Sequence, residues 1–189
     1  MPPRARLSRA AVVETAEALV DRDGWQQLTM TALAAKLGVR GPSLYSHVGS
    51  IEDLLAEVQE RALVACASRL QRAAMGKAGA TCFAALAHEL RAYATEHPGL
   101  YDLAMSEAID QERMNTAGEP AQAALRAVVE SFGIVDPPFE LQLTCFAALH
   151  GVIALDRSRL FAGTADTSDL YARTTDLVIL MLTTEGAHA

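Results

Sequence analysis

The sequence has few of the residues from which disulfide-rich, β-rich or membrane-spanning proteins are built. Aromatic residues make up 5% of the 189 positions, and cysteine occurs only at Cys66, Cys82 and Cys145. The cysteines are far apart, leave an odd thiol and show no Cys-x-x-Cys spacing, which argues against a disulfide framework or a structural zinc site. No apolar segment follows the basic N-terminus, and the late apolar run at 177–182 is too short to span a bilayer. We therefore expect a cytoplasmic protein without a membrane partner.

Motifs typical of enzymes are also missing. The sequence contains no P-loop, no glycine-rich dinucleotide motif, no nucleophile elbow and no paired-carboxylate motif. His88 and His97 are nine residues apart, a spacing that places them on opposite faces of a helix rather than around one metal ion. We expect no enzyme activity, no catalytic residue, no metal site and no cofactor.

The residues that are abundant favour helix. Hydrophobic residues make up 51% of the chain, and most of them are alanine, leucine and valine. Capping residues and glycine or proline breaks predict an all-α fold of about nine helices, with no repeat and no convincing strand. The expected helices cover residues 8–22, 29–37, 42–48, 51–74, 82–96, 99–112, 118–133, 136–160 and 168–183.

Residues 29–48 have the pattern of a helix-turn-helix, in which two short helices are joined by a turn containing glycine. Pro42 fits the first turn of the second of these helices, where a proline loses no intrahelical hydrogen bond. A small shared core is expected from Leu33, Ala34, Leu37, Val39, Leu44 and Val48. The hydroxyls and imidazole between these positions are groups that hydrogen-bond base edges or phosphates.

The charge is distributed unevenly along the chain. The net charge is −7, yet residues 1–50 contain six basic and four acidic residues, a balance of +2. Residues 51–189 contain ten basic and 19 acidic residues, a balance of −9. Such asymmetry permits an anion-binding head on an acidic body. The basic residues Arg4, Arg6 and Arg9 suit either an arm that follows DNA or a solvated tail.

Residues 28–48 read LTMTALAAKLGVRGPSLYSHV and are followed at 50–55 by SIEDLL. Over roughly residues 8–60 the chain resembles the DNA-binding head of the TetR family of bacterial transcriptional regulators. The resemblance implies a helix-turn-helix DNA-binding domain at 1–50 and a helical effector-binding and dimerisation domain at 51–189. Family members are typically homodimers that a small molecule releases from DNA.

The resemblance also implies which residues touch DNA. Thr31, Gly41, Pro42, Ser43, Tyr45, Ser46 and His47 match positions that commonly contact it. Tyr45 and His47 match positions that usually contact phosphates. One departure is Ile51, which stands where the family most often has a lysine, and a second is Gly41, which has no side chain to read a base. Sequence specificity is therefore expected from Thr31, Arg40, Ser43 and Ser46.

The C-terminal part resembles, more loosely, a subgroup of the family with a Trp-His-Gly signature, through EHPGLY at 96–101 and ALHGV at 148–152. The tryptophan is absent here. Tyr93, Tyr101, Met105 and Phe132 equally suit an effector cavity or a core. For His150, in an apolar pattern, a core histidine is favoured over a ligand contact. The candidate ligand-binding residues are Tyr93, Tyr101, Met105, Phe132, Phe146 and His150.

The apolar run at 177–182 has no polar face, so its helix should be buried on more than one side. With the helix at about 139–161 it would form a two-fold, four-helix dimer interface, of the sort that the family uses. The alternative is a central core helix in a monomer. The candidate interface residues are Leu149, Ile153, Leu177, Leu180 and Met181.

The function that these patterns favour is a ligand-responsive transcriptional repressor. Its expected partners are a palindromic double-stranded DNA operator, an unknown small-molecule effector and a second copy of the chain. The alternative is a helical bundle that binds a ligand or a protein without DNA affinity, which the acidic body and Ile51 favour.

Overall fold

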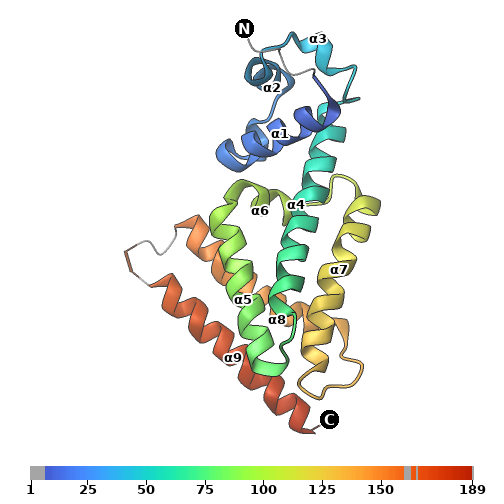
Figure 1. Ribbon diagram of the computed structural model, residues 1–189. Helices are drawn as coiled ribbons and strands as arrows, with labels where there is room; N and C mark the ends of the chain where they lie inside the picture. Colours follow the sequence, from blue (N-terminus) through green and yellow to red (C-terminus); the bar gives the residue numbers. More distant parts are fainter. Residues whose placement is uncertain (1–6, 160–162, 165, 189) are drawn as a thin grey trace. The chain divides into compact units, whose positions relative to one another are not determined.

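The computed structural model describes residues 7–159, 163–164 and 166–188 (Figure 1). Within these ranges the chain is helical, with no strand, so the all-α prediction is confirmed. The elements are α1 (Arg9–Asp23), the 3-10 turn η1 (Trp25–Gln27), α2 (Met30–Leu37), α3 (Gly41–Leu44), α4 (Ile51–Ala74), α5 (Gly79–Glu96), α6 (Pro98–Ala104), α7 (Gln111–Glu130), α8 (Phe139–Ser158) and α9 (Thr167–His188).

The chain packs as two compact units. The first contains the residues up to 65 together with 93–118, and the second contains 66–92 and the residues from 119 onward. The first unit extends past residue 50 because its apolar core includes Leu54 and Val58 of α4 and Leu103 of α6. The functional division at residue 50 stays a prediction, since packing alone does not assign a function to either side of it.

Short-range signals define the ends of the first helices. The Ser8 hydroxyl accepts from Ala11 N at 3.2 Å and begins α1, and Thr29 Oγ1 accepts from Ala32 N at 3.1 Å and begins α2. Gly38 ends α2 in the left-handed conformation, with φ 67°, which a residue with a Cβ rarely adopts. Thr29 is thus the cap of α2, and the side chain of Thr31 lies on the exposed surface of the helix.

A continuous apolar core holds the first unit together. Leu33, Leu44 and Val48 of the helix-turn-helix are almost completely buried, together with valines and leucines of α1. Leu37 and Val39 are only partly buried and pack against this cluster. The core predicted for the helix-turn-helix therefore exists, but it is larger than predicted because α1, α4 and α6 also contribute to it.

The second unit contains the packed helix pair α8 and α9 and residues 79–92 of α5. The Tyr171 hydroxyl of α9 donates to the carbonyl of Ala87 in α5 at 2.7 Å, and the guanidinium of Arg91 lies 5.2 Å from the centre of the same ring. Burial raises the pKa of Tyr171 well above its usual range. Tyr171 is therefore a neutral hydrogen-bond donor that joins α9 to α5.

Two helix predictions are wrong in the middle of the chain. A continuous helix was expected at 99–112, but α6 ends at Ala104 and α7 begins at Gln111. The intervening peptide groups hydrogen-bond to the side chain of Gln59, so a continuous helix is not needed to satisfy them. A new helix was also expected to open near Pro120, which instead lies inside α7. Proline occurs both in first turns and at interior kinks, so its presence alone did not separate the two cases.

The third helix is shorter than predicted. It was expected at 42–48, but α3 covers only Gly41–Leu44 and is followed by a turn. The amides of His47 and Val48 both donate to the carbonyl of Leu44, at 2.8 and 3.0 Å. The chain between Leu44 and Val48 is thus a compact turn fixed between two buried side chains.

Candidate nucleic-acid interface

The helix-turn-helix presents polar side chains between apolar anchors. Leu44 and Val48 are buried in the core, whereas Tyr45 between them is 58% exposed. Of the other residues predicted to contact DNA, Thr31, Arg40, Pro42, Ser43 and Ser46 are exposed, and Gly41 and His47 are partly exposed. The structure thus places all eight predicted residues on α2, on α3 or in the segments next to α3, with some surface accessible.

Hydrogen bonds within this segment hold its backbone. The amide of Ser43 donates to Arg40 O at 2.9 Å, and the hydroxyl of Ser46 donates to Ser43 O at 2.8 Å. With its proton used in this way, the Ser46 oxygen presents lone pairs, which suit an amino donor on a base edge better than a phosphate. Contact between Ser46 and a base edge stays a prediction.

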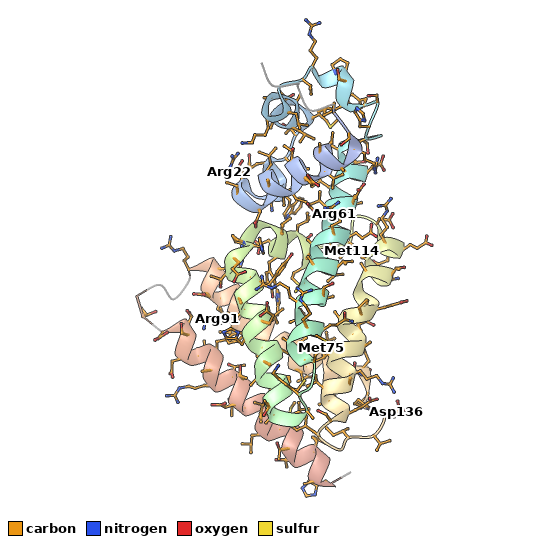
Figure 2. The ribbon with its side chains drawn as sticks, in the orientation of Figure 1. Arg22, Arg61, Met75, Arg91, Met114 and Asp136 are labelled. Carbon is orange, nitrogen blue, oxygen red and sulfur yellow. The ribbon has the colours of Figure 1, made fainter. Side chains whose placement is uncertain are left out.

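Several basic residues of the first unit are already paired. Arg61 of α4 lies beside α1 and its Nε is 2.6 Å from Glu17 (Figure 2). Arg22 pairs with the neighbouring Asp23, and this hydrogen bond lowers the pKa of the Asp23 carboxyl below its usual range. Lys36 and Arg40 are exposed, and neither forms a salt bridge with a residue that the structure describes. Lys36 and Arg40 therefore carry the accessible positive charge of the helix-turn-helix.

The first turn of α4 explains the residue that departs from the family pattern. The Ser50 hydroxyl accepts from Asp53 N at 2.9 Å and caps the helix. Ile51 is partly buried and packs against the core of the first unit. Ile51 therefore adds apolar packing between the first turn of α4 and the core of the first unit.

The six candidate ligand-binding residues divide between the two units. Tyr93, Tyr101 and Met105 lie in the first unit, where Tyr101 is 1% exposed and the Tyr93 hydroxyl donates to Ala62 O at 2.9 Å. Phe132, Phe146 and His150 lie in the second unit. The rings of Phe146 and His150 are stacked, with their centres 5.5 Å apart. Within the set the structure shows a side-chain contact between Phe146 and His150, and a cavity lined by these residues stays a prediction.

A pocket of about 280 Å³ lies in the second unit, and none of the six residues lines it. Its walls include Met75 just after α4 (Figure 2), Cys82 in α5 and Ser131 after α7. Burial raises the pKa of Cys82, as it raises those of Cys66, to about 12, and Cys145, to about 11. All three thiols are therefore protonated at neutral pH and poor nucleophiles or metal ligands. In the described ranges no group of three metal-ligating side chains is placed to hold an ion.

The second unit exposes apolar side chains on α8 and α9. Leu177 and Leu180 of α9 are 64% and 62% exposed, and Phe139 and Leu143 of α8 are about half exposed. The sequence analysis did not include Phe139 and Leu143 among the interface candidates. Their spacing of four residues, continued by an alanine and a glycine at the same interval, is visible in the sequence, and the structure shows that all four positions are exposed.

The other interface candidates differ in burial. Leu149 and Ile153 are 4% exposed and Met181 is partly buried, so Leu149 and Ile153 pack inside the protomer and leave a partner little surface to contact. α8 is long and apolar enough to cross a membrane by length and composition alone, a test that core helices of soluble proteins also pass.

Comparison with known proteins identifies both halves of the chain. Residues 12–58 match the family model described as bacterial regulatory proteins of the tetR family, and residues 83–178 match the tetracyclin repressor-like C-terminal domain. The HTH-type transcriptional regulator Rv0681 of Mycobacterium tuberculosis is 37% identical over 178 residues, which cover 93% of this chain and 80% of that protein. The chain belongs to the TetR family.

The fold of this TetR-family protein agrees with solved structures. A protein from Rhodococcus aligns with a TM-score of 0.79 and 23% identity, covering 97% of this chain and 99% of that one. FadR of Bacillus subtilis, solved with stearoyl-CoA, aligns with a TM-score of 0.68 and 13% identity, covering 90% and 97%. At these identities the structures establish the shared fold alone.

Family membership confirms the resemblance seen in the sequence. The protein is a DNA-binding transcriptional regulator of the helix-turn-helix type, with a helical C-terminal domain of the kind that responds to ligands. Members of the family bind DNA operators and small-molecule effectors and act as dimers. The alternative of a helical bundle without DNA affinity does not fit a chain whose residues 12–58 match the DNA-binding model.

Proposed function

We propose that this TetR-family protein is a homodimeric repressor of the cytoplasm that binds a near-palindromic DNA site and leaves it when a small molecule binds. The observation that carries the proposal is the turn after α3, where exposed Tyr45 and Ser46 and partly exposed His47 stand between the buried anchors Leu44 and Val48. Rigid anchoring reduces the conformational entropy that these side chains lose on binding. We expect no catalytic activity.

Each residue of this segment has a proposed role. Tyr45 and His47 donate hydrogen bonds to phosphates, which position the protein without reading sequence. Thr31, Arg40, Ser43 and Ser46 contact base edges in the major groove, and Gly41 and Pro42 allow the backbone to approach the DNA. The two half-sites lie about one helical turn or more apart, as the spacing of two heads in a dimer requires.

The first prediction tests this function. Random duplex DNA is selected on the purified protein at moderate salt, and the enriched sequence is expected to contain an inverted repeat. Replacing Tyr45 with Phe and His47 with Ala together removes two hydrogen bonds to charged groups, and should weaken binding to that sequence by about a hundredfold or more. His88→Ala, in an exposed residue of α5, is the matched control and should bind normally.

A double variant that binds as tightly as the wild type would remove the assignment of this segment to DNA. Failure of the wild type to retain any sequence, while it remains folded and dimeric, would contradict repression by the free protein. In that case the selection is repeated in the presence of a cell extract, because an effector that promotes binding would restore an inverted repeat.

The proposed dimer face comprises the exposed apolar side chains Phe139 and Leu143 of α8 and Leu177 and Leu180 of α9. Large exposed apolar side chains on a packed helix pair are typical of a surface that another protein covers. A two-fold axis would place the same four residues of a second copy against them.

The second prediction concerns this face. Leu177→Glu combined with Leu180→Glu introduces two carboxylates per protomer, and their repulsion and desolvation should convert the dimer into a monomer. Sedimentation velocity at tens of micromolar protein measures the change. Val135→Glu is the control, because Val135 is 88% exposed yet lies outside the helix pair. A double variant that stays dimeric would move the interface elsewhere.

The effector is proposed to bind within the helical region after residue 50, where Tyr93, Tyr101, Met105, Phe132, Phe146 and His150 are the candidates. A ligand releases DNA only if it binds the released conformation more tightly than the DNA-bound one. The broad apolar and aromatic character of these side chains favours an effector with a substantial apolar part.

A further inference from the structure

Arg9, at the start of α1, joins three segments that are far apart in the sequence. Its Nη1 donates to the carbonyl of His47 at 2.8 Å, and its Nη2 donates to the carboxylate of Glu57 in α4 at 2.5 Å. The partners are 38 and 48 residues away along the chain. A single guanidinium therefore links α1, the turn that follows α3, and α4.

The carbonyl of His47 needs such a donor. α3 contains only four residues, and the backbone beyond it is held by the amides of His47 and Val48, which both donate to Leu44 O. Carbonyl groups at the end of a helical segment lack intrahelical donors, and a cationic side chain satisfies them well. Arg9 therefore holds the backbone of the residue whose side chain is proposed to contact a phosphate.

Glu57 determines where the guanidinium of Arg9 lies. The carboxylate of Glu57 is 19% exposed, and it accepts one arm of the guanidinium while the other arm reaches His47. The planar fork of an arginine suits two acceptors at fixed positions, whereas the single ammonium of a lysine does not. This pairing also neutralises the charge of Arg9, which reduces what it contributes to phosphate binding.

We propose that Arg9 is a positioning residue for DNA recognition: oriented by Glu57, it fixes the carbonyl of His47 and thereby the placement of the Tyr45–His47 turn on the DNA. The inference rests on the proposed function and deepens it. The competing interpretation is that Arg9 contacts a phosphate directly, as part of a basic N-terminal arm. The two interpretations predict different results for the same variants.

The main experiment measures binding of the enriched operator and of a shuffled duplex as a function of salt, for the wild type and Arg9→Met. A positioning residue affects specific binding most. We expect Arg9→Met to lower operator affinity about tenfold and shuffled-DNA affinity little, with an unchanged slope of log K against log salt. Loss of a phosphate contact would instead lower both affinities alike and reduce the slope by about 0.9, which would overturn the proposal.

Two further variants and one control sharpen the distinction. Glu57→Ala removes a negative charge from the DNA-binding unit, so simple electrostatics predicts tighter binding, whereas loss of the Arg9 orientation predicts weaker operator binding. Glu14→Ala, in an exposed residue of α1, is the matched charge control and should not weaken binding. Arg9→Lys should remain as weak as Arg9→Met, because one ammonium does not replace the fork. Tighter binding by Glu57→Ala, or full rescue by Arg9→Lys, would contradict the proposal.

Folding is controlled separately in these variants. Thermal unfolding followed by circular dichroism should show all of them folded at the temperature of the binding assay. Their two-dimensional amide NMR spectra should differ from that of the wild type chiefly near residues 45–48. An unchanged spectrum in this segment for Arg9→Met would overturn the inference even if affinity fell. If the wild type bound no DNA with or without the cell extract, both the proposed function and this inference would fail, whereas normal operator binding by Arg9→Met would overturn the inference alone.

Discussion

Replacing Gly99 with alanine is expected to lower the free energy of unfolding by about 3 kcal/mol. A Cβ at this position would lie 2.0 Å from the carbonyl oxygen of Val20 and 2.8 Å from the Cα of Asp21. Both are backbone atoms of α1, so no side chain can rotate away and α6 must move. The movement would also weaken the bonds that Asp21 makes to His97 Nδ1 at 2.9 Å and to the amide of Leu100 at 3.5 Å.

Urea unfolding followed by far-ultraviolet circular dichroism measures this effect. Gly41→Ala is the matched control, because a Cβ there would meet no atom within 4 Å and its backbone is helical. Removing a glycine from such a site should leave stability unchanged or raise it by up to about 1 kcal/mol. Equal midpoints for Gly99→Ala and Gly41→Ala would show that α6 does not press against α1 as described.

Replacing Gln59 with leucine is the second change with a large expected effect, a loss of about 2–4 kcal/mol. Gln59 is completely buried in α4. Its Nε2 donates to Leu103 O at 2.9 Å and Glu107 O at 3.1 Å, and its Oε1 accepts from the amide of Ile109 at 3.0 Å. Leucine has a similar size but removes all three bonds, and the partly buried groups of Glu107 and Ile109 lose the partner that offsets their desolvation.

The same unfolding experiment tests this prediction, with Gln122→Leu as the control because Gln122 is exposed on α7. Hydrogen exchange adds a local measurement, in which the amide of Ile109 should lose protection in Gln59→Leu and keep it in the control. A variant with wild-type stability would imply that water satisfies residues 103–109 equally well.

Gln59→Glu should make the free energy of unfolding depend on pH, and the burial of this site determines the direction of that dependence. Burial and the two facing carbonyls disfavour the ionised carboxylate, so the pKa of the new carboxyl in the folded protein lies above its value in the unfolded chain. The stability that this group supports is present below the unfolded pKa and is lost as the pH rises through the folded pKa. The variant should therefore be closest to wild type in acid and weakest at neutral pH.

Gln59 and Gly99 show why the middle of the chain was predicted incorrectly. In the sequence, Gln59 is a polar residue beside the apolar positions of α4, and Gly99 follows a His-Pro break. Neither observation reveals that the side chain of Gln59 binds the segment between α6 and α7, or that α6 lies against the backbone of α1. Both facts depend on residues more than 40 positions apart, and local patterns do not report such contacts.

The candidate DNA site was more predictable than the effector site. Residues 28–48 form one continuous segment whose caps, glycines and apolar spacing operate over three or four residues, so their pattern is visible without the fold. The candidate ligand residues lie on several helices and in both units, and only the tertiary structure shows which of them are buried, stacked or hydrogen-bonded.

The sequence by itself determined the helical class and the helix-turn-helix, because both follow from short-range capping and apolar periodicity. Only the tertiary structure decided that Ile51 packs into the core, that Leu149 and Ile153 are buried while Leu177 and Leu180 are exposed, and that Arg9 reaches His47. The physical reason is that burial and long-range hydrogen bonds depend on which helices meet, and the same apolar or basic residue suits a core, an interface or a DNA contact until its neighbours in space are known.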